Sequence, residues 1–327
     1  MINYIIRRAG YMMVTLIIVT ILSFVIIELP PGSFLEYRIQ ALRNQGSNLS
    51  GDQIKALEER YGVNDPVYVK FWKWISGFPK GDFGWSFALE MPVADLIWGR
   101  LGFTLLISLT AFIFSWVVSI LIGVYSATHR FTLPDYTITV MQFVGISVPS
   151  FLLALLLLVF AQQTLGQDVI GLFSIEYRDA PWSWAKFVNL LQHLWIPVIV
   201  VGVSNTAWLS RVMRSNLLDV LNMQYVQTAR AKGLLEKRVI WKHAVRNAMH
   251  PMVMILGMSL PTFLSGQAVV ERVLILPTTG PLLFNALAQQ DMYLAGTLIM
   301  LLAILLLVGN LLGDVLLAWV DPRIQYD

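Results

Sequence analysis

Six stretches of the chain are apolar and long enough to cross a bilayer. A transmembrane helix needs roughly 20 mostly apolar residues, and such stretches occupy 10–29, 102–127, 136–162, 191–210, 251–270 and 292–320. Only Glu28 and Asp314 place a carboxylate in them, each near an end. The first stretch lacks a small-residue cleavage site, so we expect a retained helix rather than a cleaved signal peptide. The pattern predicts an all-α integral membrane protein with six transmembrane helices, the third kinked at Pro149.

The composition agrees with a chain that lies in a bilayer. It is 57% hydrophobic and only 13% charged, whereas soluble domains carry about 25% charged residues. Cysteine is absent, which excludes disulfides and thiolate metal sites. The four histidines are scattered, and no catalytic Ser/His/Asp set or carboxylate pair converges. We therefore expect neither a metal centre nor an active site in this chain.

Basic residues predict which side of the membrane each loop faces, because cytoplasmic loops are rich in Lys and Arg. Arg7 and Arg8 precede the first stretch, and loop 211–250 holds eight Lys and Arg against two acids. If six helices alternate, both segments lie in the cytoplasm, and loops 164–190 and 271–291 lie outside. The predicted organisation is a cytoplasmic N-terminus 1–9, a transmembrane helix 10–29, an extracytoplasmic loop 30–101, a core 102–320 that includes cytoplasmic loop 211–250, and a cytoplasmic tail 321–327.

The long loop 30–101 has enough pattern to fold. Asp52 can cap a short helix that reaches Arg60. Trp72, Trp74 and Trp85 are residues that favour a membrane interface. We expect short helices on the outer leaflet.

Loop 211–250 has the pattern of two helices joined at a glycine. Apolar residues recur at helical spacing from Asn216 onward. Gly233 follows a basic last turn, where glycine adopts the left-handed conformation of a helix cap at little cost, and helix resumes near Glu236. The small residues before and at Gly233 predict a notch, ringed by charge, that another backbone can approach. The positive-inside rule alone accounts for the charge, but not for the paired helices.

The residues around Gly233 also carry a family resemblance. The chain reads Thr228-Ala229-Arg230-Ala231-Lys232-Gly233-Leu234, then His243-Ala244, then Arg246-Asn247-Ala248. This segment resembles the coupling loop, or EAA loop, of ATP-binding-cassette importer permeases, and most closely that of the dipeptide and oligopeptide permeases. Aligned on Gly233, the Glu-Ala-Ala signature falls on Gln227, Thr228 and Ala229.

Other segments extend the resemblance over nearly the whole chain. They are Tyr61-Gly62, Asp65-Pro66, Gly81-Asp82-Phe83-Gly84 with Ser86, Pro149-Ser150-Phe151, and Asp321-Pro322-Arg323-Ile324. One departure follows Glu271, where the family's usual Pro-Gly-x-Gly is Pro277-Thr278-Thr279-Gly280. The departure leaves the cargo open between di- or oligopeptides and oligosaccharides.

The resemblance implies a mechanism driven by other chains. The sequence has no Gly-x-x-x-x-Gly-Lys-Ser/Thr phosphate loop, so ATP and Mg²⁺ would be bound by two separate ATP-binding subunits. A second, homologous permease subunit and an extracytoplasmic solute-binding protein would complete the importer in the plasma (inner) membrane of a bacterium or archaeon, with no nucleic acid involved. The residues implied to couple the ATPase to the membrane helices are Gln227, Thr228, Ala229, Arg230, Ala231, Lys232, Gly233 and Leu234.

Small polar residues inside the apolar stretches are the candidates for a translocation path. They are Ser204, Asn205 and Thr206 in the fourth stretch, and Ser259, Ser265 and Gln267 in the fifth. Such residues also pack membrane helices together, and packing is the alternative. Glu271, at the edge of an outer loop, is either an outer gate or an ordinary loop charge.

Three other functions compete with the importer interpretation. A secondary, ion-coupled transporter would need acidic residues in mid-membrane, and the stretches are nearly free of them. An intramembrane enzyme would need a nucleophile with a base, or a metal cluster. A passive channel would transport without any ATPase partner.

Overall fold

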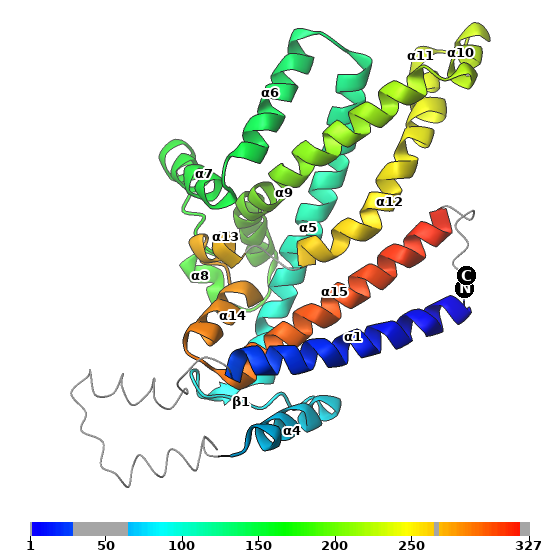
Figure 1. The fold of residues 1–327 in the computed structure, drawn as a ribbon. Coiled ribbons are helices and arrows are strands. Elements are labelled where there is room, and N and C mark those ends of the chain that lie inside the picture. The colour runs from blue at the N-terminus through cyan, green and yellow to red at the C-terminus, as the bar shows by residue number, and fades with distance from the viewer. Residues whose placement is uncertain (1, 29–64, 265–267, 321–327) are drawn as a thin grey trace. The chain divides into compact units, whose positions relative to one another are not determined.

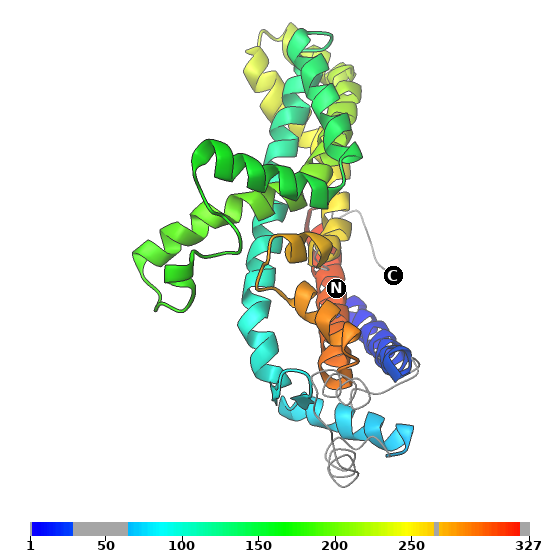
Figure 2. The same cartoon turned by 90° about the vertical axis from the view of Figure 1, so that its left-hand side faces the viewer.

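The computed structural model describes residues 2–28, 65–264 and 268–320, and these are almost entirely helical (Figures 1 and 2). The longer helices, of ten residues or more, are α1 (Ile2–Glu28), α4 (Val67–Gly77), α5 (Val93–Thr128), α6 (Leu133–Ser147), α7 (Ser150–Leu165), α9 (Trp184–Leu221), α12 (Val245–Leu264), α14 (Thr279–Ala288) and α15 (Met292–Val320). The shorter ones are η1 (Phe78–Lys80), α8 (Ile175–Arg178), α10 (Gln224–Ala231), α11 (Glu236–Arg238), η2 (Val239–Ala244) and α13 (Ala268–Val273). Two-residue strands β1 (Trp85–Ser86) and β2 (Met91–Pro92) pair antiparallel.

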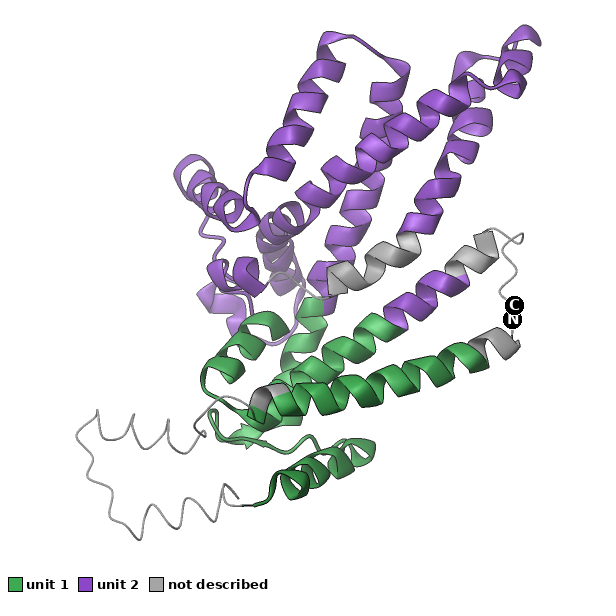
Figure 3. Ribbon diagram, viewed as in Figure 1, with its two compact units in different colours: residues 1–104, 278–307 green, residues 105–277, 308–327 purple. Residues whose placement is uncertain are grey.

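The chain divides into two compact units, which Figure 3 colours separately. Unit 1 comprises residues 1–104 and 278–307, and unit 2 comprises residues 105–277 and 308–327. The long helices α5 and α15 each contribute to both units. The predicted helical class is therefore correct, with one small hairpin added in the segment 30–101.

Four helices are long and apolar enough to cross a membrane among the described residues. These candidate spans are Ile6–Val25, Val93–Thr128, Trp184–Leu221 and Met292–Val315. They correspond to the first, second, fourth and sixth predicted stretches. The predicted fifth stretch, 251–270, overlaps α12, which ends at Leu264 and is not among the four.

The third predicted stretch is not one helix with a kink. It consists of α6 and α7, whose axes are bent by 111° relative to each other at a short break. Val148 at the break is extended, with φ of −78° and ψ of 123°, as expected for the residue before a proline. Pro149 then starts the new helix as its N-cap. Counting the bent pair as one span gives up to five candidates among the described residues, and the predicted six are not confirmed.

The core of unit 1 holds Trp74 in its interior. This residue is only 2% exposed, stacks on Phe24, and donates a hydrogen bond from its indole N–H to Thr297 Oγ1 at 3.2 Å. The prediction of an interfacial position was therefore wrong for Trp74, whereas Trp72 and Trp85 are exposed. Helix α4 confirms a short helix in this loop, and the predicted helix from Asp52 to Arg60 lies outside the described residues.

The hairpin of unit 1 explains the Gly81-Asp82-Phe83-Gly84 motif. Gly81 and Gly84 have φ of 75° and 85°, which favour glycine. The Gly84 amide donates to Asp82 Oδ1 at 2.9 Å. A Cβ atom at Gly84 would lie 2.6 Å from Cδ1 of Tyr293, so the motif also allows the hairpin to approach α15.

Candidate functional site

The candidate coupling loop is built from four helical segments of unit 2. Helix α9, which is one of the candidate membrane spans, ends at Leu221, and α10 begins at Gln224. The helix predicted to start at Asn216 is thus the end of α9 followed by a separate helix, α10. After Gly233, helix resumes at Glu236 as predicted, first as α11 and then as the π-helical turn η2.

The turn at Gly233 confirms the predicted glycine cap. Gly233 has φ of 73°, and its amide donates to the carbonyl oxygen of Arg230 at 2.9 Å. The amide of Leu234 donates to the carbonyl oxygen of Ala229 at 3.4 Å. These two bonds form a Schellman motif, which satisfies carbonyls at the end of a helix. No atom lies within 4 Å of a Cβ built on Gly233, so glycine is needed here for its conformation and not for space inside the chain.

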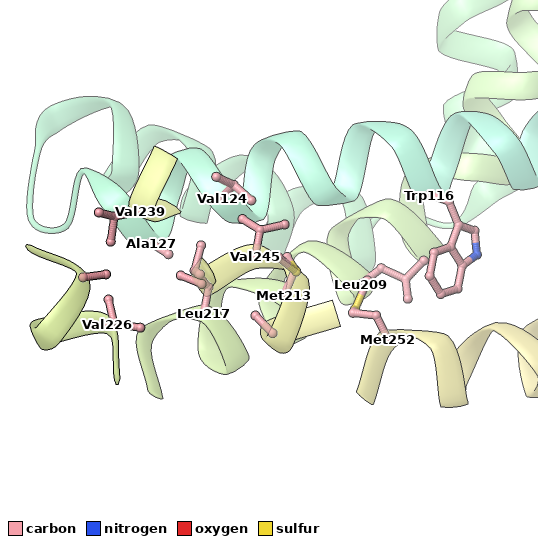
Figure 4. Packing of buried hydrophobic residues seen from close by; sticks show 13 residues of the cluster. Trp116, Val124, Ala127, Leu209, Met213, Leu217, Val226, Val239, Val245 and Met252 are labelled. Atoms are coloured by element: carbon pink, nitrogen blue, oxygen red, sulfur yellow. The ribbon is translucent and has the colours of Figure 1, made fainter. Parts of the chain in front are cut away.

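An apolar cluster fixes α10 to the membrane helices, and we call it the coupling body (Figure 4). Val226 and Ala229 of α10 belong to one buried cluster with Met213 and Leu217 of α9 and with Val239 of η2. Its buried members are Trp116, Val124, Ala127, Leu209, Met213, Leu217, Val226, Ala229, Val239, Ala244, Val245, Ala248 and Met252. Close-packed interiors transmit strain, so the coupling body links α10 to the ends of α5, α9 and α12.

The predicted notch is smaller than the sequence indicated. Ala229 is only 7% exposed and belongs to the coupling body, so its small side chain fits the chain's own core. Ala231, Lys232 and Gly233 are exposed, as are Gln227 and Thr228. The outward surface is therefore the last turn of α10 together with the glycine turn, and Leu234 is partly buried against the coupling body.

Arg230 closes the glycine turn with an ion pair. Its Nη2 lies 2.8 Å from Glu236 Oε1, and its Nε lies 3.2 Å from both carboxylate oxygens. This hydrogen bonding lowers the pKa of Glu236 and raises that of Arg230. The pair bridges α10 and α11 across Gly233, so Arg230 shapes the turn as well as charging its surface.

A second polar contact joins α10 to the base of α12. The side-chain amide of Asn247 donates to the hydroxyl of Tyr225 at 2.8 Å. Between the two helices, η2 takes the wider π-helical turn, a feature frequently found at functional sites. The apolar side chains of Met223, Leu235 and Trp241 in this loop are also exposed.

The predicted path residues in α9 make contacts inside the chain. Ser204 Oγ donates to the carbonyl oxygen of Gly145 at 3.1 Å, and the Asn205 amide donates to the carbonyl oxygen of Val201 at 3.4 Å. Thr206 is buried, and its hydroxyl has no hydrogen-bond partner among the described residues. Ser265, Gln267 and the side chain of Ser259 lie outside the described residues.

Glu271, the predicted outer gate, is buried. It lies in α13 and is 5% exposed. The residue interacts with another group in the chain. A path role for the polar residues and a gate role for Glu271 stay predictions.

Two buried carboxylates escaped the sequence analysis. In unit 1, Asp291 accepts hydrogen bonds from Ser86 Oγ at 2.6 Å, from the Ala88 amide at 3.1 Å and from the Leu294 amide at 3.3 Å. Burial raises its pKa. Its position directly before an apolar stretch is the sequence signal of a helix N-cap, and the carboxylate fixes the hairpin to the start of α15.

In unit 2, the second missed carboxylate is Asp135. Its side chain is 3% exposed, and Oδ2 lies 3.0 Å from Nη2 of Arg214. The predicted third stretch began one residue later, at 136, and Arg214 was assigned to the cytoplasmic loop. The available signal was the turn sequence Thr132-Leu133-Pro134-Asp135, since Thr at an N-cap followed by an acid three residues later marks a helix start.

Comparison with known proteins gives consistent similarities. The family described as "Binding-protein-dependent transport system inner membrane component" matches residues 119–326, and the family for the N-terminal part of such components matches residues 1–110. The oligopeptide transport system permease protein AppB of Bacillus subtilis is 37% identical over 324 residues, which is 99% of both chains. The glutathione transport system permease protein GsiC of Escherichia coli K12 is 32% identical over 326 residues, which is 100% of both chains.

The fold is also similar to that of a solved transporter. A chain of the MetNI methionine ABC transporter, in inward-facing conformations, aligns with a TM-score of 0.50. The alignment covers 70% of this chain and 96% of that chain at 17% sequence identity. At this level of identity the match supports the helical arrangement of the core.

Proposed function

The chain belongs to the inner-membrane components of binding-protein-dependent transport systems, and from that membership we propose that it is the peptide-carrying permease subunit on which an ATPase subunit acts through α10. It works as part of an ABC importer, and ATP and Mg²⁺ bind to partner subunits. In this proposal the chain forms part of the transport path, and α10 acts as a lever that transmits movement from the ATPase to the membrane helices. Hydrolysis of ATP takes place on the partner subunits.

One observation carries the lever assignment. Helix α10 presents an exposed last turn and the exposed Gly233 turn on one side, while Val226 and Ala229 on its other side are buried in the coupling body. A partner that docks on the outer side thus acts on a segment packed against α5, α9 and α12. Rigid-body movement of such packed helices is one of the established ways to switch a protein between states.

The partner assignment follows from the same membership. We assign Gln227, Thr228, Ala231, Lys232 and Gly233 to the ATPase contact, because these are the exposed members of the predicted set. Ala229, Arg230 and Leu234 support that surface from within, through the coupling body and the ion pair to Glu236. A second permease subunit, two ATPase subunits and a solute-binding protein complete the importer.

The cargo we propose is a short peptide. Two relatives similar over their whole length are described as transporting oligopeptides and glutathione, and glutathione is itself a small peptide. Nothing in the described residues favours the oligosaccharide alternative. The orientation we propose places loop 211–250 and both ends of the chain in the cytoplasm, following the distribution of Lys and Arg.

The test uses two glycines with the same backbone requirement. Gly233 and Gly166 both have positive φ, 73° and 63°, and no atom lies within 4 Å of a Cβ built on either. A valine is strained at both positions. In the reconstituted importer, Gly233→Val should abolish the stimulation of ATP hydrolysis by peptide-loaded binding protein, because the strained turn displaces the docking surface. Gly166→Val, at the end of α7, should retain it.

Three results would contradict the proposal. Equal stimulation in the two variants would remove the lever role of the Gly233 turn. Stimulation by binding protein loaded with oligosaccharide, and none with peptide, would overturn the cargo. Peptide uptake into proteoliposomes that proceeds without ATP would overturn the importer mechanism in favour of an ion-coupled transporter or a channel.

A further inference from the structure

Helix α6 is attached to its neighbours through its polar residues. The buried residues of α6 are Asp135 and Gln142, whereas its large apolar side chains such as Val140, Met141 and Val144 are 54–71% exposed. A helix in a soluble protein has the opposite arrangement, with apolar side chains buried and polar side chains exposed. It suits a bilayer, where apolar side chains face lipid and hydrogen bonds hold helices together.

The polar contacts form one row between α6 and α9. Gln142 Nε2 donates to Ser210 Oγ at 2.9 Å, and Ser204 Oγ donates to the carbonyl oxygen of Gly145. A Cβ on Gly145 would lie 2.8 Å from Cγ1 of Val203, so glycine permits the close approach. We call this row, together with Asp135 and Arg214, the polar seam.

The seam ends at a carboxylate that joins four parts of unit 2. Asp135 accepts a short hydrogen bond from Ser126 Oγ of α5, one from the amide of Phe131 in the α5–α6 turn at 3.1 Å, and one from Arg214 Nη2 of α9 at 3.0 Å. Phe131 has φ of 62°, an uncommon conformation for a non-glycine residue. The carboxylate therefore holds a strained turn in place and binds the start of α6 to two helices.

Arg214 lies at the junction between the seam and the coupling body. Its neighbour Met213 and, one turn on, Leu217 are fully buried members of the coupling body. Arg214 itself is turned to α6, with a side chain 30% exposed. The same turns of α9 thus contact α10 through apolar side chains and α6 through an ion pair.

We propose that Asp135 and Arg214 are positioning residues for energy coupling, which lock α6 to the coupling body so that a displacement of α10 is carried into α6. The inference rests on the proposed function, because it assigns a route for the movement that the ATPase applies. Without the lock, α10 moves and ATP is hydrolysed, but α6 no longer follows.

The chain offers a matched control for the charge of Arg214. Arg211 lies on the same helix, three residues earlier, and its guanidinium packs over the ring of Phe143 at 5.5 Å from the ring centroid. Arg211→Gln removes the same positive charge from the same helix and the same predicted side of the membrane. It removes the contact with Phe143 of α6 but leaves the Asp135 carboxylate paired, so it separates the ion pair from the positive-inside effect and from a second contact between α9 and α6.

The experiment measures distance and coupling in the same complex. The sequence contains no cysteine, so spin labels can be attached at Cys residues introduced by Met141→Cys on α6 and Lys237→Cys on α11, both exposed positions. Pulsed EPR then records this distance in nucleotide-free and vanadate-trapped importer. With Asp135 and Arg214 unchanged, the distance between the two labels should have one narrow distribution that is the same in both states, since α6 and the coupling body move together.

Asp135→Asn and Arg214→Gln should broaden that distribution and lower the peptide imported per ATP about tenfold, within the usual range of coupling between sites. Arg211→Gln should match the unaltered importer in both measurements. The double variant Asp135→Asn/Arg214→Met removes both charges and leaves none buried alone, so it should assemble. It should remain uncoupled.

The proposal is wrong if the assembled double variant keeps the narrow distribution and the transport ratio of the unaltered importer. It is also wrong if Arg211→Gln uncouples as strongly as Arg214→Gln. The distance measurement needs no cargo, so failure of the lock in an importer that carries peptide is distinguishable from failure of the proposed function.

Discussion

Helices α10 and α6 pack against the same helix, α9, by opposite means. Helix α10 buries Val226 and Ala229 in one apolar cluster with Met213 and Leu217, while α6 buries Asp135 and Gln142 against Arg214 and Ser210. The difference follows from the surroundings that the sequence predicts. Water drives apolar side chains together, but lipid does not, so a membrane helix relies on hydrogen bonds and close approach.

This contrast has a consequence for movement. An apolar cluster holds its members at many points, so it resists deformation as a whole. A polar seam holds at a few defined atoms, so single substitutions can release it. The coupling body is then the rigid part of unit 2, and the seam is the place where the transmission of movement can be cut.

The largest expected effect tests the apolar side of the comparison. Leu217 is fully buried in the coupling body, and Leu217→Ala should cost about 2–5 kcal/mol through lost burial and the cavity left behind. Hydrogen–deuterium exchange of residues 224–231 in the assembled importer should rise, because α10 loses its packing partner. Leu133→Ala, at a side chain 80% exposed, is the matched control and should change exchange little. Equal exchange in the two variants would mean that α10 is held by something other than the coupling body.

A smaller effect is expected on the polar side. Gln142→Leu keeps the size of the side chain and removes the hydrogen bond to Ser210 Oγ. The expected cost is about 0.6–2 kcal/mol, the range found for hydrogen bonds between membrane helices. Thermal unfolding of the importer in lipid nanodiscs measures it, with Met141→Leu at the adjacent exposed position as the control. A gain in stability from Gln142→Leu would contradict the statement that hydrogen bonds hold α6 against α9, since an apolar contact would then hold it better.

Local signals in the sequence located the Gly233 turn correctly. Gly233 after a basic helical turn, and a new helix at Glu236, follow from backbone preferences that hold whatever surrounds them. The membrane stretches with uniform apolar character were also found, because length and composition decide them. The membership in the importer family rests on motifs of the same local kind.

Contacts between distant segments were not visible in the same way. Ala229 was assigned to an outer notch because it is small, but three-dimensional packing buries it. Asp135 and Arg214 are 79 residues apart, and each alone has the appearance of an ordinary loop charge. The 111° bend between α6 and α7 exceeds what a proline requires in a helix, so Pro149 predicted the position of the break but not its size.

The smallest expected effect concerns the ion pair in the water-exposed turn, which sharpens the contrast with the buried pair at Asp135. Arg230 lowers the pKa of Glu236, so the pair stabilises the folded turn above the pKa that Glu236 has when unfolded. That stabilisation is lost as the pH falls through the folded-state pKa. Because Glu236 is 54% exposed, solvent screens the pair and its contribution is about 0.2–1 kcal/mol.

Hydrogen–deuterium exchange of residues 230–236 should therefore rise slightly more on acidification in the unaltered protein than in Glu236→Gln, once both are corrected for the intrinsic pH dependence of exchange. High salt should reduce this difference in exchange between the unaltered protein and Glu236→Gln. An identical pH response in the two proteins would mean that the bidentate contact adds nothing to the turn beyond the Gly233 cap.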